Sequence, residues 1–236
     1  MVLKVANIIS IWWIFGLLVL WIVLTSIGSF YLKWNYFLKA KHCNYSVNKN
    51  IIALTFDDGP HPIFTPKVLK LLKQYNAKAT FFCIGKNAEK HPEIIRKLIS
   101  EGHSIGNHSY SHAKNYGFLS TRKIITDLSK AQDVLKEITN REIILFRPPF
   151  GVTNPNIGKA VIQLNLQTFG WSIRAFDTVA KNPNKVFLKI NSRLKKGDVV
   201  LLHDTSHLSI IVLEQLLRTF KQNRIKSVTL NQLFNI

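Results

Sequence analysis

Acidic residues are scarce in this chain of 236 residues: 13 aspartates and glutamates stand against 32 lysines and arginines, which gives a formal net charge of +19. A charge of this size favours anionic partners such as cell-wall polymers, phospholipid surfaces or nucleic acid, although a lysine-rich proteome would produce the same excess. No basic run alternates with aromatic residues as a nucleic-acid groove requires. We therefore expect no nucleic-acid partner.

Cysteine is rare, and sequence repetition is absent. Cys43 follows an apolar N-terminal segment and Cys83 lies inside the apolar run 80–84. Settings this different indicate two unpaired thiols rather than a disulfide, so the cysteines do not identify the redox compartment. The lack of an internal repeat or a low-complexity tract excludes a repeat architecture.

Charge is missing altogether between Lys4 and Lys33, and residues 8–31 are dense in Ile, Leu, Val, Trp and Phe. About 20 apolar residues in a helix cross a bilayer core, so we expect one N-terminal transmembrane helix. A cleaved signal peptide is the alternative, but its apolar region is shorter, about 7–15 residues. The length and the tryptophans favour an anchor. The predicted organisation is an anchor (1–32), a basic linker (33–48) and one domain (49–236).

Within residues 49–236, short β-rich apolar runs alternate with longer segments of helical periodicity. This alternation indicates βα units around a parallel sheet. Seven strands are predicted, at 51–56, 79–84, 103–106, 143–146, 167–171, 199–202 and 225–228. Helix starts are predicted at His91, Ser120, Asn154 and Asn182, where a polar residue precedes the first turn. Seven or eight such units close naturally into a barrel, although an open doubly wound sheet fits the same pattern.

Unusual polar residues follow the ends of these predicted strands. They are Asp57 and Asp58 after the first strand, His108 and His112 after the third, Arg147 after the fourth, Asp177 after the fifth, and His203 and Asp204 after the sixth. In a βα barrel the carboxyl ends of the strands share one face, which holds the active site. The sequence therefore predicts one polar site at this face.

Two imidazoles and a carboxylate among these residues suggest a metal site. His108 and His112 stand at i and i+4, where one metal could reach both from a helical turn. With one aspartate they form a three-ligand site with open positions, which suits Zn²⁺ or another divalent transition metal acting as a Lewis acid. Two neighbouring carboxylates repel unless a metal neutralises one, so the second aspartate is free to act as a base.

Two further residues complete a hydrolytic set. Arg147 lies in a stiff Arg-Pro-Pro turn, where its guanidinium would hold Asp57 ionised and oriented. His203 ends a buried strand beside the predicted metal site. A general acid is the role that suits a histidine in that position.

Four segments together resemble the successive motifs of the polysaccharide deacetylases, the NodB-homology or carbohydrate esterase family 4. They are Thr-Phe-Asp-Asp-Gly-Pro (55–60), His-Ser-Tyr-Ser-His (108–112), Arg-Pro-Pro-Phe-Gly (147–151) and Leu-Leu-His (201–203). The resemblance follows the family's order and covers residues 49–236. It implies an α/β fold, a distorted (β/α)₇ barrel of the NodB type, here preceded by the transmembrane helix.

The resemblance also implies a role for each site residue. Catalytic roles go to Asp57 as general base, Arg147 as its positioning group, His203 as general acid, and Asp177. One divalent ion, Zn²⁺ or alternatively Co²⁺, Ni²⁺ or Mn²⁺, would be held by Asp58, His108 and His112. The oxyanion and substrate contacts would be the backbone N–H of Phe150, with Pro148 and Leu201.

The fourth motif departs from the family pattern Asp-x-x-Asp-Trp. Arg174 replaces the first acid and Thr178 replaces the tryptophan, while Asp177 matches the retained acid. We expect Asp177 to lie beside His203. Arg174 suggests either a contact to an anionic substrate group or a structural salt bridge.

The expected activity is the removal of N-acetyl groups from N-acetylglucosamine-type residues of an acetylated polysaccharide, either peptidoglycan or a chitin-like chain. The alternatives are an O-acetyl esterase or another amide hydrolase on the same fold, and a catalytically silent carbohydrate-binding relative. We expect a monomer held in a bacterial cell membrane by a single pass, with residues 49–236 outside. Lys33, Lys39 and Lys41 after the span oppose this orientation mildly, but large domains translocate regardless of flanking charge.

Overall fold

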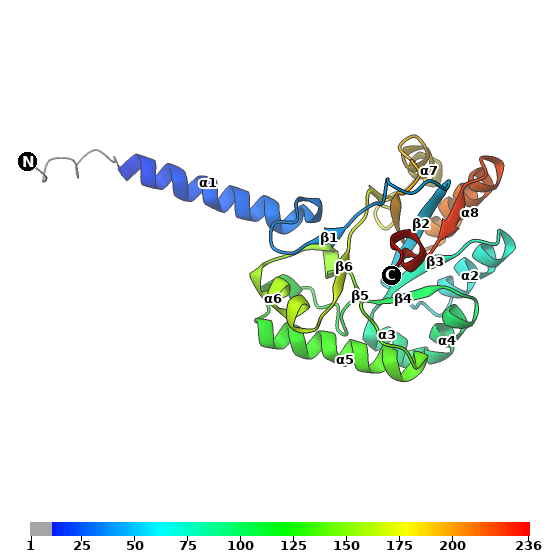
Figure 1. Ribbon diagram of the computed structural model, residues 1–236, viewed down its shortest axis with the longest axis horizontal. Coiled ribbons are helices and arrows are strands. Elements are labelled where there is room, and N and C mark those ends of the chain that lie inside the picture. Colours follow the sequence, from blue (N-terminus) through cyan, green and yellow to red (C-terminus); the bar gives the residue numbers. More distant parts are fainter. Residues whose placement is uncertain (1–10) are drawn as a thin grey trace, which may run out of the picture.

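The chain, described here from a computed structural model over residues 11–236, is built around one curled sheet of nine strands, all paired in parallel (Figure 1). The strands are β1 (Ala40–Lys41), β2 (Ile51–Asp57), β3 (Ala79–Cys83), β4 (Ser104–Asn107), β5 (Leu145–Phe146), β6 (Gln167–Phe169), β7 (Ile173–Arg174), β8 (Val199–His203) and β9 (Lys226–Val228). Their order is β1-β6-β5-β4-β3-β2-β8-β7, and β9 pairs with β2. This is a distorted, open βα barrel, which confirms the predicted fold class.

All seven predicted strands are present, and two short ones are added. β7 pairs with β8 (Ile173 opposite Val200), and β1 pairs with β6 (Ala40 opposite Thr168). β1 lies in the segment predicted as a linker, so part of residues 33–48 extends the sheet. Asp177 accordingly follows β7 rather than the fifth predicted strand.

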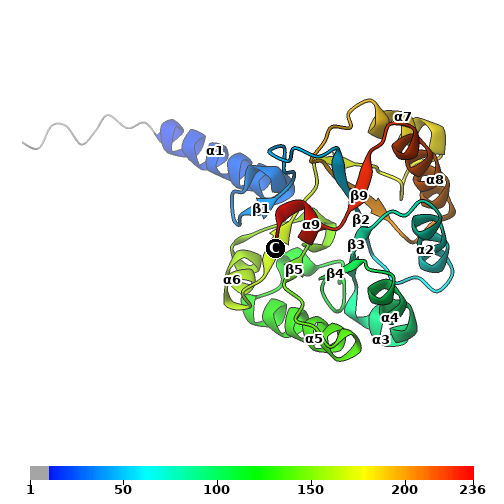
Figure 2. The same cartoon turned by 45° about the vertical axis from the view of Figure 1, so that its right-hand side comes forward.

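Helices surround the sheet, as Figure 2 shows. They are α2 (Phe64–Gln74), α3 (Gly85–Lys90), α4 (Pro92–Ser100), α5 (Thr121–Thr139), α6 (Pro155–Gln163), α7 (Pro183–Asn191) and α8 (His207–Gln222), with short 3₁₀ turns η1 (Leu32–Trp34), η2 (Tyr116–Phe118) and η3 (Pro149–Gly151). The predicted helix starts are confirmed. The side chains of Ser120, Asn154 and Asn182 each accept a hydrogen bond from the backbone N–H three residues on, which satisfies a donor that the first helical turn leaves free.

The interior of the barrel is filled from its N-terminal end. Helix α9 (Leu230–Phe234) follows β9, and its buried Leu230 and Leu233 pack with Phe82, Phe169 and Val199 from the strands. Because apolar side chains occupy this end, the polar residues that follow the strands are left at the opposite end, where the sequence predicted the site.

Helix α1 (Ile11–Phe30) projects away from the barrel (Figure 1). It is long and apolar enough to cross a membrane, and almost none of it is buried. Its last turn touches the barrel, because the backbone N–H of Thr153 donates to the carbonyl of Ser29 at 2.9 Å. The Thr153 hydroxyl also donates to the carbonyl of Gly28 at 3.3 Å. The helix end is therefore joined directly to the loop that follows η3.

Candidate active site

Arg147 and Asp57 form a buried ion pair at the end of β2. The Nη1 of Arg147 donates to Asp57 Oδ1 and to the hydroxyl of Thr55, both at 2.8 Å. Its Nε and Nη2 donate to the carbonyls of Phe169 and Gly170. Burial lowers the pKa of Arg147, and the charge of Asp57 opposes this shift. Because protein oxygens fix the guanidinium on every side, Asp57 is held in one orientation beside a permanent positive charge.

Asp58, His108 and His112 form a compact group that fits a divalent metal. Asp58 Oδ1 lies 3.4 Å from His108 Nε2 and 3.3 Å from His112 Nε2, and the three ligand atoms lie within 4.8 Å of one another. Ligands about 2.0–2.2 Å from a tetrahedral zinc ion are about 3.4 Å apart. These separations therefore match a shared ion.

The protonation of the group also suits a metal. Burial would raise the pKa of Asp58, but the neighbouring histidines lower it well below its usual range. Burial and His108 lower the pKa of His112 to about 4, so its ring is neutral at physiological pH. His108 lies between Asp57 and Asp58, whose charges outweigh burial and raise its pKa. A metal that binds here would therefore compete with a proton for His108.

The loop that brings the two histidines together is not the helical turn that the sequence suggested. Ser109 (φ 63°) and His112 (φ 47°) adopt the left-handed conformation. The backbone N–H groups of Tyr110 and Ser111 donate to the carboxylate of Asp127 on α5. The Nδ1 of His108 lies 2.8 Å from the carbonyl of Arg147. A carbonyl only accepts, so Nδ1 donates and Nε2 is left to bind a metal.

His203 contacts Asp177, as predicted from the fourth motif. Its Nδ1 lies 2.9 Å from Asp177 Oδ1, and its backbone N–H donates to Oδ2 at 2.8 Å. The hydroxyl of Ser209 donates to the same Oδ2 at 2.6 Å. Burial alone would lower the pKa of His203, but Asp177, with Asp57 and Asp58 behind it, raises it above its usual value. The contacts with Asp177 therefore orient the His203 ring and favour its protonated form.

A small pocket of about 80 Å³ collects most of the predicted site residues. It is lined by Asp57, Asp58, His108, His112, Phe150, Gly151, Trp171, Arg174, Leu201 and His203. Phe150 is half-exposed and lies at φ 60° in η3, with its ring 4.5 Å from that of His112. Pro148 is buried and does not line the pocket.

Trp171 is a lining residue that the sequence analysis did not single out as a site residue. It comes shortly after β6, so the rule that found the other residues, position after a strand end, also points to it. Gly151 leaves room for it, because a Cβ there would lie 2.5 Å from the Trp171 ring. Thr178 of the altered fourth motif is exposed and lies outside the pocket.

Asp204 points away from the pocket. Its buried carboxylate accepts a hydrogen bond from the hydroxyl of Thr65 and packs under Gly59. Burial, aided by the charge of Asp58, raises the pKa of Asp204 to about 7. The Asp204 carboxylate therefore packs against the turn that follows Asp57 and Asp58, on the side away from the pocket.

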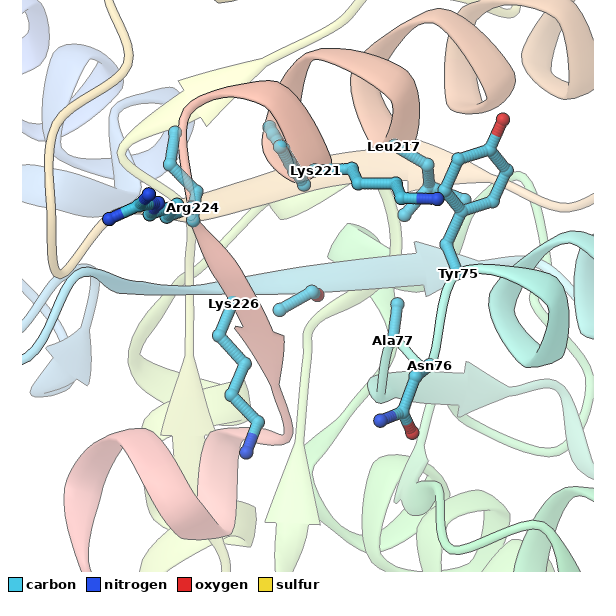
Figure 3. A pocket seen from close by; sticks show the side chains of 10 residues that line it. Tyr75, Asn76, Ala77, Leu217, Lys221, Arg224 and Lys226 are labelled. Atoms are coloured by element: carbon cyan, nitrogen blue, oxygen red, sulfur yellow. The ribbon is translucent and has the colours of Figure 1, made fainter.

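A separate cavity of about 280 Å³ opens where β3 and β9 begin, at the other end of the barrel. Figure 3 shows that its labelled side chains come from the turn before β3, from the end of α8 and from the segment that leads into β9. Lys221, Arg224 and Lys226 line it. None of the residues predicted to carry chemistry reaches this cavity.

The chain matches known proteins over most of its length. Residues 44–169 match the family model described as polysaccharide deacetylase. A peptidoglycan-N-acetylglucosamine deacetylase of Bacillus cereus is 36% identical over 193 residues, covering 79% of this chain and 89% of that protein.

Solved structures agree with the sequence matches. The Bc1960 peptidoglycan N-acetylglucosamine deacetylase superposes with a TM-score of 0.77 at 34% identity, covering 83% of this chain and 92% of that one. A family 4 acetyl xylan esterase from Clostridium thermocellum, solved with a cobalt ion, gives 0.72 at 30% identity, covering 78% and 90%. The chain therefore belongs to the polysaccharide deacetylase family and is an enzyme of that family.

Proposed function

We propose that this enzyme removes N-acetyl groups from N-acetylglucosamine-type residues of peptidoglycan, and that it needs one divalent metal ion. The observation that carries the proposal is the juxtaposition in one pocket of a metal-fitting group with two proton carriers. The two proton carriers are Asp57, held by the guanidinium of Arg147, and His203, which alone of the two is held by a carboxylate, that of Asp177. The names of the B. cereus relative and of the Bc1960 enzyme support the substrate class.

Asp58, His108 and His112 would hold the metal, and when bound it would supply Lewis-acid polarisation of the acetamide carbonyl. Zn²⁺ suits this donor set, with Co²⁺, Ni²⁺ and Mn²⁺ as alternatives. The cobalt ion in the related esterase supports a divalent cation in such a site.

The remaining chemistry falls to side chains and backbone of this chain. Asp57 takes a proton from the attacking water, whose oxygen bonds to the carbonyl carbon. The backbone N–H of Phe150 donates to the oxyanion that forms. His203 gives its Nε2 proton to the amide nitrogen as the carbon–nitrogen bond breaks. The carboxyl proton of the acetic acid passes to the amine, and proton exchange through solvent returns Asp57 to its carboxylate form and His203 to its protonated form. Acetate and a protonated amino sugar result, so atoms and protons balance.

Measurement of released acetate tests the proposal. Peptidoglycan, a chitooligosaccharide and acetylated xylan would be compared, each before and after exhaustive chelation and after return of Zn²⁺ or Co²⁺. We expect acetate and new free amines from peptidoglycan, loss on chelation and recovery with metal. Acetate from xylan alone would favour the ester alternative, which the related xylan esterase keeps open. Full activity after chelation would refute the metal requirement.

We also propose that α1 anchors a single chain in the cell membrane, with residues 49–236 on the outer side. The exposed apolar surface of α1 supports this, as does the tie between its last turn and Thr153. Protease added to intact spheroplasts should digest the domain and spare the anchor. Protection of the domain would place it on the inner side.

A further inference from the structure

A second pocket, of about 200 Å³, adjoins the catalytic pocket. The two pockets share Trp171 and Arg174 in their walls. The second one is otherwise lined by the segment that follows α1, including Lys33, and by Lys189 and Arg193 from α7 and the turn after it. A ligand in this pocket would therefore lie next to the sugar that occupies the catalytic site.

Four cationic side chains line this second pocket, and none of them pairs with a carboxylate of the described chain. Within residues 11–236, none of Lys33, Arg174, Lys189 and Arg193 forms an ion pair with an acidic side chain. The sequence left open a structural salt bridge for Arg174, and that alternative is wrong for the described chain. The Nε of Arg174 is buried without a hydrogen-bond partner, so the guanidinium keeps unused donor capacity.

Two of the four cations, Arg174 and Lys189, are held close together by aromatic side chains. The guanidinium carbon of Arg174 lies 4.9 Å from the centre of the Phe176 ring, and the Nζ of Lys189 lies 4.3 Å from the same centre. Trp171 supports Arg174 from another side at 5.4 Å. Like charges gathered on one ring repel, and that repulsion is relieved by an anion between them.

His42, which also lines the pocket, adds no charge of its own. Burial lowers its pKa to about 4, and Lys33 and Arg147 act in the same direction. The positive character of the pocket therefore comes from permanent cations and persists across the physiological pH range.

We propose that this pocket binds a carboxylate of an acidic glycan, on the sugar unit next to the one that is deacetylated. The inference rests on the proposed function and narrows its substrate class to acidic glycans. Muramic acid units of peptidoglycan carry a lactyl group, whose carboxylate is free where no stem peptide is attached, whereas chitooligosaccharides are neutral. An arginine fork beside lysines is the usual way in which proteins recognise a carboxylate. The enzyme should therefore prefer acidic glycans to neutral ones of equal length.

An anionic lipid headgroup offers the same charge, because Phe30 and Tyr31 at the end of α1 also line the pocket. The glycan is the better occupant because the pocket adjoins the catalytic one and shares Trp171 and Arg174 with it. The experiment has separate arms for the two sources.

The test compares two double variants of the full chain in neutral detergent. K189Q/R193Q removes one lysine and one arginine from the proposed subsite. K221Q/R224Q removes the same pair of residue types from the basic cavity at the other end of the barrel, and it serves as the matched control. Each is assayed on a muramic-acid-containing glycan strand with free lactyl carboxylates and on a chitooligosaccharide of equal length.

For K189Q/R193Q, the ratio of kcat/KM on the acidic strand to kcat/KM on the neutral one should fall about three- to tenfold, as expected for two solvent-accessible charge contacts. The change should appear in KM. Added salt should raise the wild-type KM for the acidic strand more than for the neutral one, because salt screens these contacts. The control should keep the wild-type ratio.

Binding measured by titration calorimetry, without turnover, separates this proposal from the proposed function. If the chain releases no acetate from any glycan, the proposed function fails, and the subsite is still judged by whether the acidic strand binds more tightly than the neutral one. An unchanged ratio, or equal loss on both glycans, would overturn the subsite. Phosphatidylglycerol added to the micelles is the lipid arm. The proposal is wrong if K189Q/R193Q, but not the control, abolishes binding of phosphatidylglycerol while binding of the glycan strand stays unaltered. In that case the second pocket binds a lipid headgroup.

Discussion

Asp177 holds His203 at two points: one carboxylate oxygen lies 2.9 Å from the imidazole Nδ1, and the other accepts the backbone N–H of His203 at 2.8 Å. Because the carboxylate accepts from Nδ1–H, the ring is oriented with Nε2 toward the pocket, 3.9 Å from Asp58 Oδ2. The same negative charge favours the imidazolium and helps to raise the pKa of His203 against the effect of burial.

Asp177→Asn should lower turnover and move the alkaline limb of the pH–rate profile to lower pH. A general acid must carry its proton, so activity falls as the pH rises through its pKa. Removing the carboxylate lowers that pKa, and the fall begins at lower pH. The measurement is kcat against pH on one glycan, with metal content determined in parallel. An unchanged profile with normal metal content would show that Asp177 does not act through His203.

Asp57→Asn should remove most of the turnover while the metal stays bound. Asparagine keeps an oxygen that can accept from Arg147 but cannot take a proton from water. Loss of a general base lowers kcat by about 10²–10⁴. Metal analysis of the purified variant should give the wild-type content. If the metal is lost together with activity, Asp57 is a ligand rather than the base.

His112→Ala should lose metal and activity together. His112 supplies one of three predicted ligand atoms, and its neutral ring, with a pKa of about 4, is ready to bind a cation. Elemental analysis after dialysis, together with acetate release, measures both effects. His91→Ala is a matched control, because His91 lies at the start of α4 outside the pocket and should leave metal and activity unchanged. Retention of metal by His112→Ala would remove His112 from the ligand set.

The positions of the site residues were predictable because parallel βα units bring the carboxyl ends of all strands to one face. Asp57 and His203 end strands that are long or apolar enough to recognise, and His108 and Arg147 directly follow such strands. β7 was not predicted, since a strand of two residues shows no alternation. The separate placement of Asp177 after it was missed for the same reason.

Two details depended on contacts that spacing does not encode. The i, i+4 spacing of His108 and His112 suggested a helical turn. Instead, the carboxylate of Asp127 on α5 accepts hydrogen bonds from the intervening backbone N–H groups, and the loop contains residues in the left-handed conformation. The interactions of Arg174 depended on which charged residues α7 and the turn after it place in the same pocket. Those are lysine and arginine rather than an acid, and only the three-dimensional arrangement shows this.

Arg147→Met should destabilise the fold by about 3–5 kcal/mol, because it leaves the buried carboxylate of Asp57 without its partner. Arg147 is fully buried, and its other donors serve Thr55 and two backbone carbonyls. Urea unfolding of the chain in neutral detergent gives the free energy of unfolding. The double variant R147M/D57N should recover part of the loss. If it is as unstable as the sum of the two single variants, the ion pair is not the source of the effect.

Asp204→Asn should alter how stability depends on pH. The folded pKa of Asp204, about 7, lies above its ordinary value of 3.8, so the folded state holds this proton more tightly than the unfolded chain. Stability therefore falls as the pH rises from the lower value through the upper one. Asparagine has no proton to lose and should abolish that part of the fall. Because one pKa unit corresponds to about 1.4 kcal/mol, the gain over wild type at alkaline pH is on the order of a few kcal/mol.

The comparison is the difference in unfolding free energy between Asp204→Asn and wild type, measured below the unfolded pKa and again above the folded one. At the lower pH the aspartic acid is protonated in both states, so that difference reports only the change of a hydroxyl for an amide beside Thr65. The further gain at the higher pH isolates the ionisation of Asp204. Thr65→Val removes the hydrogen bond that opposes the raised pKa, so it should extend the fall in stability to higher pH and enlarge its total. A difference that stays constant between the two pH values would mean that Asp204 ionises at its ordinary pKa, and that burial under the Asp57–Asp58 turn does not keep it neutral.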